Sequence, residues 1–232
     1  MKRKLLLTLI TVISQTLSGQ THFYTSEKLS SNQITQICQD KDGYLWIGTE
    51  YGLNKYDGYR FTNYLHDAGN QNTVSSNVIS CLFQDCEGTL WVGTQTGLDR
   101  YNPESNRFVS VEMKGAASLP RINAIIQEDS CHLLIGTAGY GLFRLNTRDN
   151  SSEKLDGYAK GDNNFFSYIH IDKKGYFWKS GYGHSIIRRS GNGLIEEMTS
   201  PYGTVTGFLD YEDGVLIICN HGMLFYRDGQ LL

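Results

Sequence analysis

Histidine can act as a general acid or base and as a metal ligand. The six histidines of this chain are scattered along the sequence. Histidines that share a metal ion on one element usually lie three to five residues apart, so that their ring nitrogens converge. No two of them have a spacing of three or four; they are His22, His66, His132, His170, His184 and His221. The last two fall at corresponding positions of a sequence repeat, where a metal pair is the alternative reading. We expect ordinary loop histidines there and predict no metal site.

Asp40 and Asp42 stand before Gly43 in an order that superficially suggests a calcium loop. The calcium-binding loop of an EF-hand needs a further oxygen ligand at its fifth position and a Glu at its twelfth, and both are missing. The sequence also lacks a nucleophile elbow, a zincin motif, a phosphate-binding loop and the kinase signatures. We therefore expect a tight turn at 40–43 and predict no cofactor and no enzymatic activity.

A third group of polar and aromatic residues has the chemistry of ligand binding without catalysis. Tyrosine rings stack on sugar faces, and Glu, Gln and Arg side chains hydrogen-bond to hydroxyl groups. Each candidate lies in a segment that we expect to form a loop at one rim of the fold, and an ordinary solvated loop is the alternative at every position. The candidates are Glu50, Tyr51, Gln95, Arg121, Tyr140, Tyr182, His184 and His221.

The elements that must position these residues come from an internal repeat. The first two copies share a Ser-Asn-x-Ile segment, then Asp-x-x-Gly-x-Leu-Trp-Ile/Val-Gly-Thr, then Gly-Leu-x-Arg/Lys-Tyr, and Trp91 follows Trp46 by 45 residues. Three weaker copies follow. Leu134 takes the Trp place 43 residues after Trp91, Trp178 follows 44 residues later, and Ile217 is expected in that place 39 residues further on. A repeat of this length indicates stacked copies of one supersecondary unit.

Each copy reads as a small antiparallel sheet. In the first copy, Ile34–Gln39 and Tyr44–Thr49 are apolar runs on either side of the Asp42-Gly43 turn signal. Gly52–Tyr56 and Arg60–Leu65 supply two further strands. Four short strands per repeat without helical periodicity predict an all-β fold, a β-propeller of four-stranded antiparallel blades with about five blades present. We expect the Trp rings to fill the spaces between blades, and Gly48 and Gly93 to permit a close approach of backbone or a bulge.

The five cysteines are Cys38, Cys81, Cys86, Cys131 and Cys219, an odd number that forbids complete internal pairing. Cys38, Cys81 and Cys219 fall inside apolar strand-like runs, where a free thiol behaves as a small hydrophobe. We expect buried thiols, with one disulfide as the alternative in an oxidising compartment.

The N-terminus has the pattern of a signal peptide over 1–19. Lys2-Arg3-Lys4 precedes an apolar run from Leu5 to Ile13, and Ser18-Gly19 supplies a small-residue cleavage site. Residues 20–232 are then the propeller, with repeats at approximately 29–73, 74–118, 119–164, 165–203 and 204–232. They contain 18 Lys and Arg against 24 Asp and Glu, a net charge of −6, and no second apolar run of membrane-spanning length. We predict a periplasmic location, no nucleic-acid partner and no later membrane span.

This combination of motifs resembles the two-component regulator propeller repeat, which forms the periplasmic sensor region of hybrid two-component histidine kinases. The resemblance is most specific over 29–61 and 74–108 and weakens toward 204–228. The third copy has Cys131 in place of the turn Gly and no Trp, and the fourth has Ser180-Gly181 in place of Gly-Thr. The resemblance implies seven-bladed rings, often two in tandem, with a β-sandwich, a membrane span, a kinase, a receiver and a DNA-binding domain after them.

The number of blades leaves two alternatives open. The chain ends at 228–232, directly after an expected third strand, so that Thr21–Glu27 would have to supply the outermost strand of a closed five-bladed ring. The other alternative, which the family expectation favours, is part of a seven-bladed ring.

The resemblance implies a sensor module that responds to an oligosaccharide, as a fragment of a longer sensor kinase. A second propeller or a second copy of the chain is a further candidate partner. The alternatives are an interaction scaffold without a small ligand and a propeller lyase or hydrolase, since fold alone does not choose between them.

Overall fold

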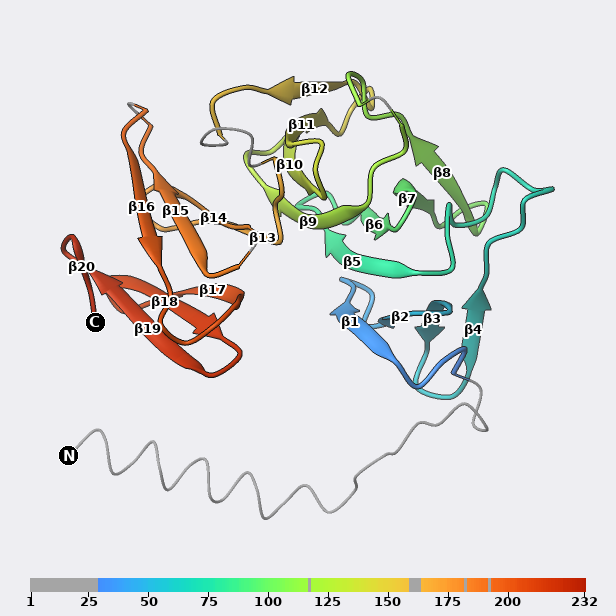
Figure 1. The fold of residues 1–232 in the computed structure, drawn as a ribbon. Coiled ribbons are helices and arrows are strands. Elements are labelled where there is room, and N and C mark those ends of the chain that lie inside the picture. The colour runs from blue at the N-terminus through green and yellow to red at the C-terminus, as the bar shows by residue number, and fades with distance from the viewer. Residues whose placement is uncertain (1–28, 117, 159–163, 182, 192) are drawn as a thin grey trace, which may run out of the picture.

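The computed structural model describes residues 29–116, 118–158, 164–181, 183–191 and 193–232. Across these residues the chain consists of strands and turns without a helix, and the strands form five separate four-stranded sheets (Figure 1). Each sheet is antiparallel, and its strands are ordered as they follow in the chain. The predicted all-β architecture of four-stranded blades is confirmed.

The strands of the first three blades have the following bounds: β1 (Ile34–Gln39), β2 (Leu45–Thr49), β3 (Gly52–Tyr56) and β4 (Phe61–Tyr64); β5 (Ile79–Gln84), β6 (Leu90–Thr94), β7 (Gly97–Asn102) and β8 (Arg107–Val111); β9 (Ile122–Gln127), β10 (His132–Thr137), β11 (Leu142–Asn146) and β12 (Ser152–Leu155). The last two blades contain β13 (Tyr168–Ile171), β14 (Phe177–Ser180), β15 (Ser185–Arg189) and β16 (Ile195–Thr199); β17 (Val205–Tyr211), β18 (Gly214–Cys219), β19 (Gly222–Arg227) and β20 (Gln230–Leu231).

The blades are arranged around an axis by their first strands. Along the series β1, β5, β9, β13 and β17, each strand lies beside the next, and the other three strands of each blade extend outward (Figure 1). A sheet placed in this way is covered on both faces by its neighbours, which explains why the second strand of a blade is a continuous apolar run. In β6 all five residues are buried.

The turn between the first two strands is closed by one aspartate. Oδ1 of Asp40 accepts the backbone amides of Asp42 and Tyr44, and Gly43 takes a positive φ of 89°. Oδ2 of the same side chain accepts the indole N–H of Trp46 at 2.7 Å. Both carboxylate oxygens of Asp40 thus accept hydrogen bonds from within the protein, which supports the turn prediction over a calcium loop.

The three tryptophans of the repeat fill the spaces between blades, as expected. Trp46, Trp91 and Trp178 are fully buried. Trp46 packs among Ile79, Val92 and Tyr101 of the second blade, with its ring centroid 4.7 Å from that of Tyr101 in an edge-on arrangement. The Tyr that ends the Gly-Leu-x-Arg/Lys-Tyr motif therefore covers the Trp of the preceding blade.

The glycine after the Trp provides a close approach between blades. A Cβ built on Gly48 would lie 2.7 Å from Cγ2 of Ile79, and one on Gly93 would lie 2.9 Å from Cγ2 of Ile122. The first strand also bulges opposite this position, between Ile34 and Gln36. Of the two alternatives predicted for these glycines, the bulge is found opposite both of them, and the group that approaches from the next blade is an isoleucine side chain and not backbone.

The fifth blade corrects the predicted register. Cys219 pairs with Val205 at a bulge, as Thr49 pairs with Ile34, so the Trp place three residues earlier belongs to Leu216. Ile217 instead faces the fourth blade and packs with Trp178. The prediction failed because Asp213-Gly214 resembles the turn motif, whereas the chain makes a tighter turn there, with Glu212 at a positive φ of 52°.

The fifth blade also ends differently from the expectation. The chain does not stop after a third strand, since β20 pairs with β19 through Tyr226–Leu231 and Arg227–Gln230. The last position of this blade is thus occupied by its own C-terminal residues. Thr21–Glu27, proposed above for that position, and the predicted signal peptide at 1–19 lie outside the described residues.

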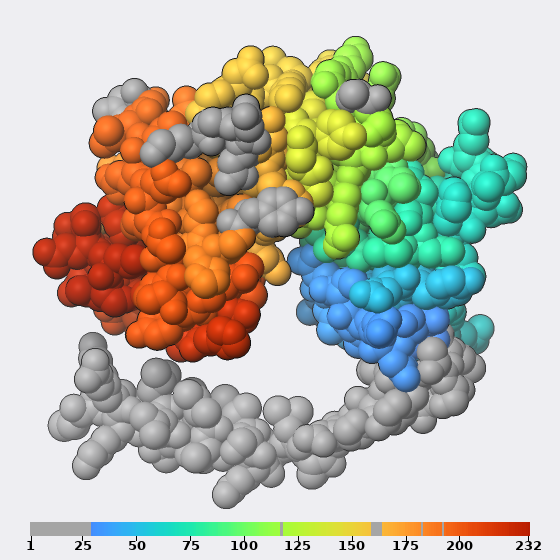
Figure 2. All heavy atoms as spheres, viewed as in Figure 1, coloured from blue at the N-terminus to red at the C-terminus, as the bar shows by residue number. Residues whose placement is uncertain are grey.

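The first and fifth blades each present an uncovered face. Figure 2 shows open space between the first blade, in blue, and the fifth, in red. Ile37 of β1 is 57% exposed, whereas its counterpart Leu82 in β5 is 5% exposed. On the fifth blade, Leu209 and Met223 are exposed. The described blades therefore form an open arc.

All five cysteines are free. Cys81 and Cys219 are buried, Cys38 and Cys131 are half-buried and Cys86 is exposed. In the part of the chain that the structure describes, no helix has the length and apolar character needed to cross a membrane.

Candidate functional site

A cavity of about 840 Å³ lies where the first strands of four blades converge. Its wall alternates apolar residues with polar ones. In these four blades an apolar residue (Ile34, Ile79, Ile122 or Phe166) stands where the first strand begins, and the residue after it points toward the axis. That residue is polar in every repeat, and four of these side chains line the cavity: Thr35, Ser80, Asn123 and Ser167. We call this cavity the axial cavity. Its volume falls within the range of small-molecule binding pockets.

Several of its polar side chains are held by neighbouring blades. Asn123 donates through Nδ2 to the carbonyl of Phe166 at 3.0 Å, and Gln36 accepts the amide of Leu82 at 3.0 Å. Ser80 donates to the carbonyl of Ile122. These bonds cross from one blade to the next, so the cavity wall is fixed before any ligand arrives.

Arg121 stands at the mouth of the axial cavity. Its neighbours in the chain, Pro120 and Ile122, are buried, and its carbonyl accepts the amide of Ala138 at 3.0 Å. The backbone is thus anchored on both sides, while the side chain itself is exposed. Among the described residues that line the cavity, Arg121 is the only charged one.

The thiol of Cys81 lines the same cavity in its neutral form. Burial raises the pKa of Cys81 to about 12, against smaller opposing effects of the Gly93 backbone and of Arg121. A thiol that stays protonated at neutral pH is a poor nucleophile. Cys81 therefore acts as an apolar wall residue.

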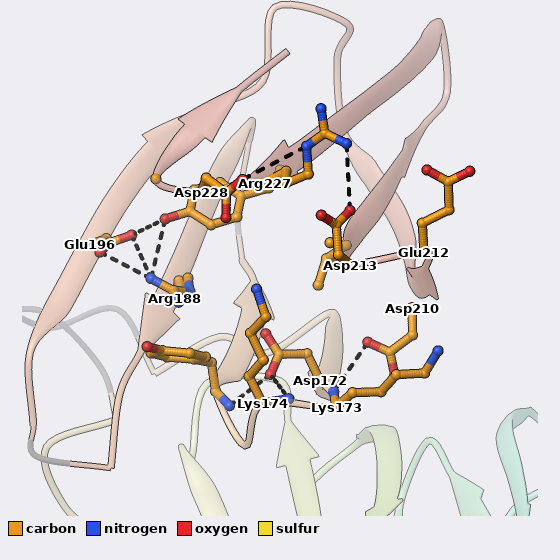
Figure 3. Close-up of a pocket in the computed structure, with 15 residues that line it drawn as sticks. Asp172, Lys173, Lys174, Arg188, Glu196, Asp210, Glu212, Asp213, Arg227 and Asp228 are labelled. Carbon is orange, nitrogen blue, oxygen red and sulfur yellow. Dashed lines mark hydrogen bonds and ion pairs between the residues drawn. The ribbon is translucent and has the colours of Figure 1, made fainter.

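A second hollow, of about 430 Å³, lies between the fourth and fifth blades at the opposite end of the first strands (Figure 3). Many of the side chains that line it are charged, but most of them form ion pairs or hydrogen bonds with other residues of the protein. Glu196 binds Arg188 at 3.0 Å, Asp213 lies 3.5 Å from Arg227, and Asp172 accepts the indole N–H of Trp178. Tyr226 donates to Glu196 at 2.7 Å, and the pKa of Glu196 is lowered, first by this bond and then by Arg188.

The same hollow recurs between the first and second blades, which argues that it is a product of the repeat. Lys55 there lies over the ring of Tyr44 at 3.7 Å, as Arg188 lies over Tyr176 at 3.4 Å. In both places the cation also faces the Tyr of the next blade. A cation between two aromatic rings stabilises the blade interface by cation–π attraction. We therefore assign these hollows to blade packing and retain the axial cavity as the candidate site.

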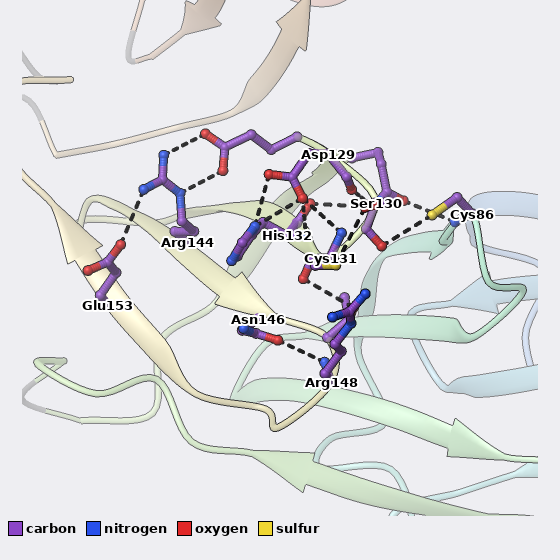
Figure 4. A network of polar contacts seen from close by, with 12 residues as sticks. Cys86, Asp129, Ser130, Cys131, His132, Arg144, Asn146, Arg148 and Glu153 are labelled. Atoms are coloured by element: carbon purple, nitrogen blue, oxygen red, sulfur yellow. Dashed lines mark hydrogen bonds and ion pairs between the residues drawn. The ribbon is translucent and has the colours of Figure 1, made fainter.

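The third blade replaces the missing Trp by a different polar pair. Glu128 occupies the place of the capping aspartate, six residues before Leu134, and it binds Arg144 through two hydrogen bonds of 2.6 and 2.7 Å (Figure 4). In the adjoining turn, Asp129 binds His132 at 2.9 Å. The amide of Cys131, followed by His132, holds the pKa of Asp129 below its usual value. The network closes the turn that lacks glycine.

The eight predicted ligand-binding residues are distributed along one end of the blades. The backbone amides of Glu50 and Gln95, in the β2–β3 and β6–β7 loops, donate to Gln33 and Val78, just before the first strands. His221 similarly donates to Tyr202. Glu50, Tyr51, Gln95, His184 and His221 are exposed, and Tyr140 is half-buried with its hydroxyl bonded to Ser118. Tyr182 lies outside the described residues.

Of the seven members of this set that the structure describes, Arg121 alone lines the axial cavity. Sequence reasoning missed the cavity residues on the first strands, although their pattern of one polar residue after the first apolar residue of each repeat was visible. Among the described residues there is no group of three or more His, Cys, Asp and Glu side chains that could hold a metal ion.

Two segments, 28–51 and 73–96, match the family model described as "Two component regulator propeller". These segments are two-component regulator propeller repeats. A stretch of 52 residues is 44% identical to histidine kinase P4 from Formosa agariphila, and this covers 22% of the chain and 4% of that kinase.

Solved structures share the fold over most of the chain. An extracellular domain of a proposed one-component system from B. thetaiotaomicron superposes with a TM-score of 0.71 at 16% identity, over 89% of this chain and 28% of that one. An extracellular domain of a proposed hybrid two-component system from the same organism superposes with a TM-score of 0.56 at 18% identity, over 88% of this chain and 35% of that one. A gluconolactonase from Xanthomonas campestris superposes with a TM-score of 0.60 at 13% identity, over 82% of this chain and 70% of that one. The chain thus spans about a third of the sensor structures that it resembles.

Proposed function

We propose that the chain is an exported, ligand-sensing propeller module of a two-component regulator, and that its ligand is an oligosaccharide bound in the axial cavity. The observation that carries the proposal is the coincidence of two regulator propeller repeats with a prearranged polar cavity on the propeller axis. The similarity to extracellular sensor domains supports a location outside the cytoplasm.

The cavity wall favours binding over catalysis. The described residues that line it include no Asp, Glu, His or Lys, so no general base of ordinary pKa faces the cavity. Burial keeps the Cys81 thiol protonated. In this proposal, signalling follows from ligand-dependent packing of the blades, because a ligand shifts an equilibrium by binding one arrangement more tightly than another.

A binding screen tests the proposal. We would titrate the purified chain with a panel of neutral and acidic tetrasaccharides and follow binding by isothermal titration calorimetry. At least one member should bind, and Tyr168→Ala, which removes an exposed ring from the cavity, should weaken its affinity. Tyr51→Ala, which removes an exposed ring from the outer loop set, is the matched control and should leave the affinity unchanged.

Two results would overturn this assignment. Loss of affinity in Tyr51→Ala but not in Tyr168→Ala would move the site to the outer loops. Absence of binding by every member of the panel would favour the interaction scaffold.

A further inference from the structure

The axial cavity carries a charge that the blade architecture does not require. Arg121 is the residue whose carbonyl receives the amide from the second-to-third-strand loop of its blade. The same backbone bond in three other blades is received by residues with neutral side chains, namely Gln33, Val78 and Thr204. A cation at this position is therefore specific to the third blade.

The guanidinium of Arg121 has no anionic partner within the described part of the protein. Some arginines of this chain are engaged by carboxylates: Arg144 binds Glu128 at 2.6 Å and Arg188 binds Glu196 at 3.0 Å. No such pair is formed by Arg121, and no carboxylate lines the axial cavity among the described residues. Arg121 thus presents an uncompensated positive charge in a chain whose formal net charge is −3.

A second unengaged group lies on the wall of the same cavity. Tyr168 of β13 is 41% exposed and lines the cavity together with Arg121. Asn123, Gln36 and Ser80 already exchange hydrogen bonds with neighbouring blades, as described above. The groups left for a ligand therefore include a guanidinium and an aromatic ring, beside the hydroxyl groups of Thr35 and Ser167. The guanidinium and the ring together match a molecule with an anionic substituent and an apolar ring face.

We infer that the axial cavity selects acidic saccharides, with Arg121 binding the anionic group and Tyr168 contacting the sugar ring. This inference rests on the proposed function and adds the class of ligand. The anionic group is a uronate carboxylate or a sulfate ester, both of which accept paired hydrogen bonds from one guanidinium. Salt should weaken the interaction, because the arginine is exposed to solvent.

The experiment compares matched charged and neutral probes by isothermal titration calorimetry. The first pair is tetragalacturonate and its methyl ester. The second is a sulfated galactan tetrasaccharide without uronate and its desulfated form. Each is titrated into the wild type, Arg121→Gln and Arg148→Gln. Arg148 is an exposed arginine of the same blade that does not line the cavity, and circular dichroism checks that all variants remain folded.

At least one charged probe should bind more tightly than its neutral form, and Arg121→Gln should lower that affinity by about tenfold or more, the loss expected for a charge-assisted pair. Arg148→Gln should leave it unchanged. The two charged probes distinguish carboxylate from sulfate. Equal affinity of charged and neutral probes, or of Arg121→Gln and the wild type, would overturn the inference and leave the proposed function standing. Absence of binding by all four probes and by the wider panel of neutral and acidic tetrasaccharides would overturn both.

Discussion

The indole nitrogen of Trp46 donates a 2.7 Å hydrogen bond to Oδ2 of Asp40, six residues earlier in the chain. The same bond joins Trp91 to Asp85 and Trp178 to Asp172, at 2.8 Å in each case. Because the other carboxylate oxygen closes the turn, one side chain fixes both the turn and the ring that fills the blade interface. The fixed spacing of Asp and Trp in the repeat follows from this double use.

Asp40→Asn should lower the free energy of unfolding by about 1–3 kcal/mol, the usual cost of an unsatisfied buried polar group. An asparagine has one oxygen acceptor, so either the turn amides or the indole N–H of Trp46 loses its partner. Chemical denaturation measures the change. Asp42→Asn in the same turn is the control, since that side chain is exposed, and its effect should stay within about 0.5 kcal/mol. Equal effects of the two variants would show that the bond to Trp46 contributes nothing.

Gly48→Ala should destabilise the protein by about 1–3 kcal/mol through overpacking. The new methyl group would lie 2.7 Å from Cγ2 of Ile79 in the next blade, and the backbone of Gly48 does not have a positive φ, so the effect comes from contact alone. Gly191→Ala, which has no neighbour within 4 Å, is the control. In an Ile79→Ala background the Gly48→Ala change should cost less, and an unchanged cost would contradict the contact between the blades.

The sequence predicted the strands of the first blade to within a residue, because Asp40, Gly43 and Trp46 are local signals. It also identified the interblade role of the Trp and the bulge beside the glycine, but not the isoleucine side chain that contacts the glycine from the next blade. The fifth blade was shifted by one residue, since Asp213-Gly214 looks like the turn motif. In the structure Asp210 pairs with Val215 as Gln39 pairs with Leu45, so the turn between these strands is one residue shorter in the fifth blade. A one-residue shift reverses which face each side chain points to.

The candidate site was less accessible to sequence reasoning than the blades. Arg121 was identified from its position before a first strand, but Ser80, Asn123 and Tyr168 were not. Their role depends on which strand lies nearest the axis, a property of the assembled ring and not of one repeat. The cavity is formed by residues that are distant in the sequence, so no single motif describes it.

Lys179→Met should stabilise the protein at neutral pH and reduce its response to alkaline pH. Lys179 is 1% exposed and takes the place held by Ile47 and Val92 in other blades. Burial lowers the pKa of Lys179 from 10.5 to about 8, against a smaller opposing effect of Glu197. Between these values the unfolded chain binds a proton that the folded chain does not, so stability from this group rises with pH by up to about 1.4 kcal/mol per unit.

The measurement is the difference in unfolding free energy between Lys179→Met and the wild type from pH 7 to pH 10. The variant should be the more stable at pH 7, and its advantage should shrink as pH rises above 8. A constant difference across this range would show that the lysine titrates normally in the folded protein.

A polar substitution on the uncovered face of the first blade should cost less stability than the same substitution at the matching position of the second blade. Ile37 and Leu82 occupy matching positions, but Ile37 is 57% exposed and Leu82 is 5% exposed and packed beside Trp46. Leu82→Ser should therefore lower the free energy of unfolding by about 2–5 kcal/mol, as for other large-to-small changes in a core. Ile37→Ser should change it by less than about 0.5 kcal/mol, the range of surface substitutions.

An exposed apolar face also promotes association, so sedimentation velocity should show less concentration-dependent self-association for Ile37→Ser than for the wild type. A cost for Ile37→Ser close to that for Leu82→Ser would mean that this face is covered in solution, and the open arc would then be wrong.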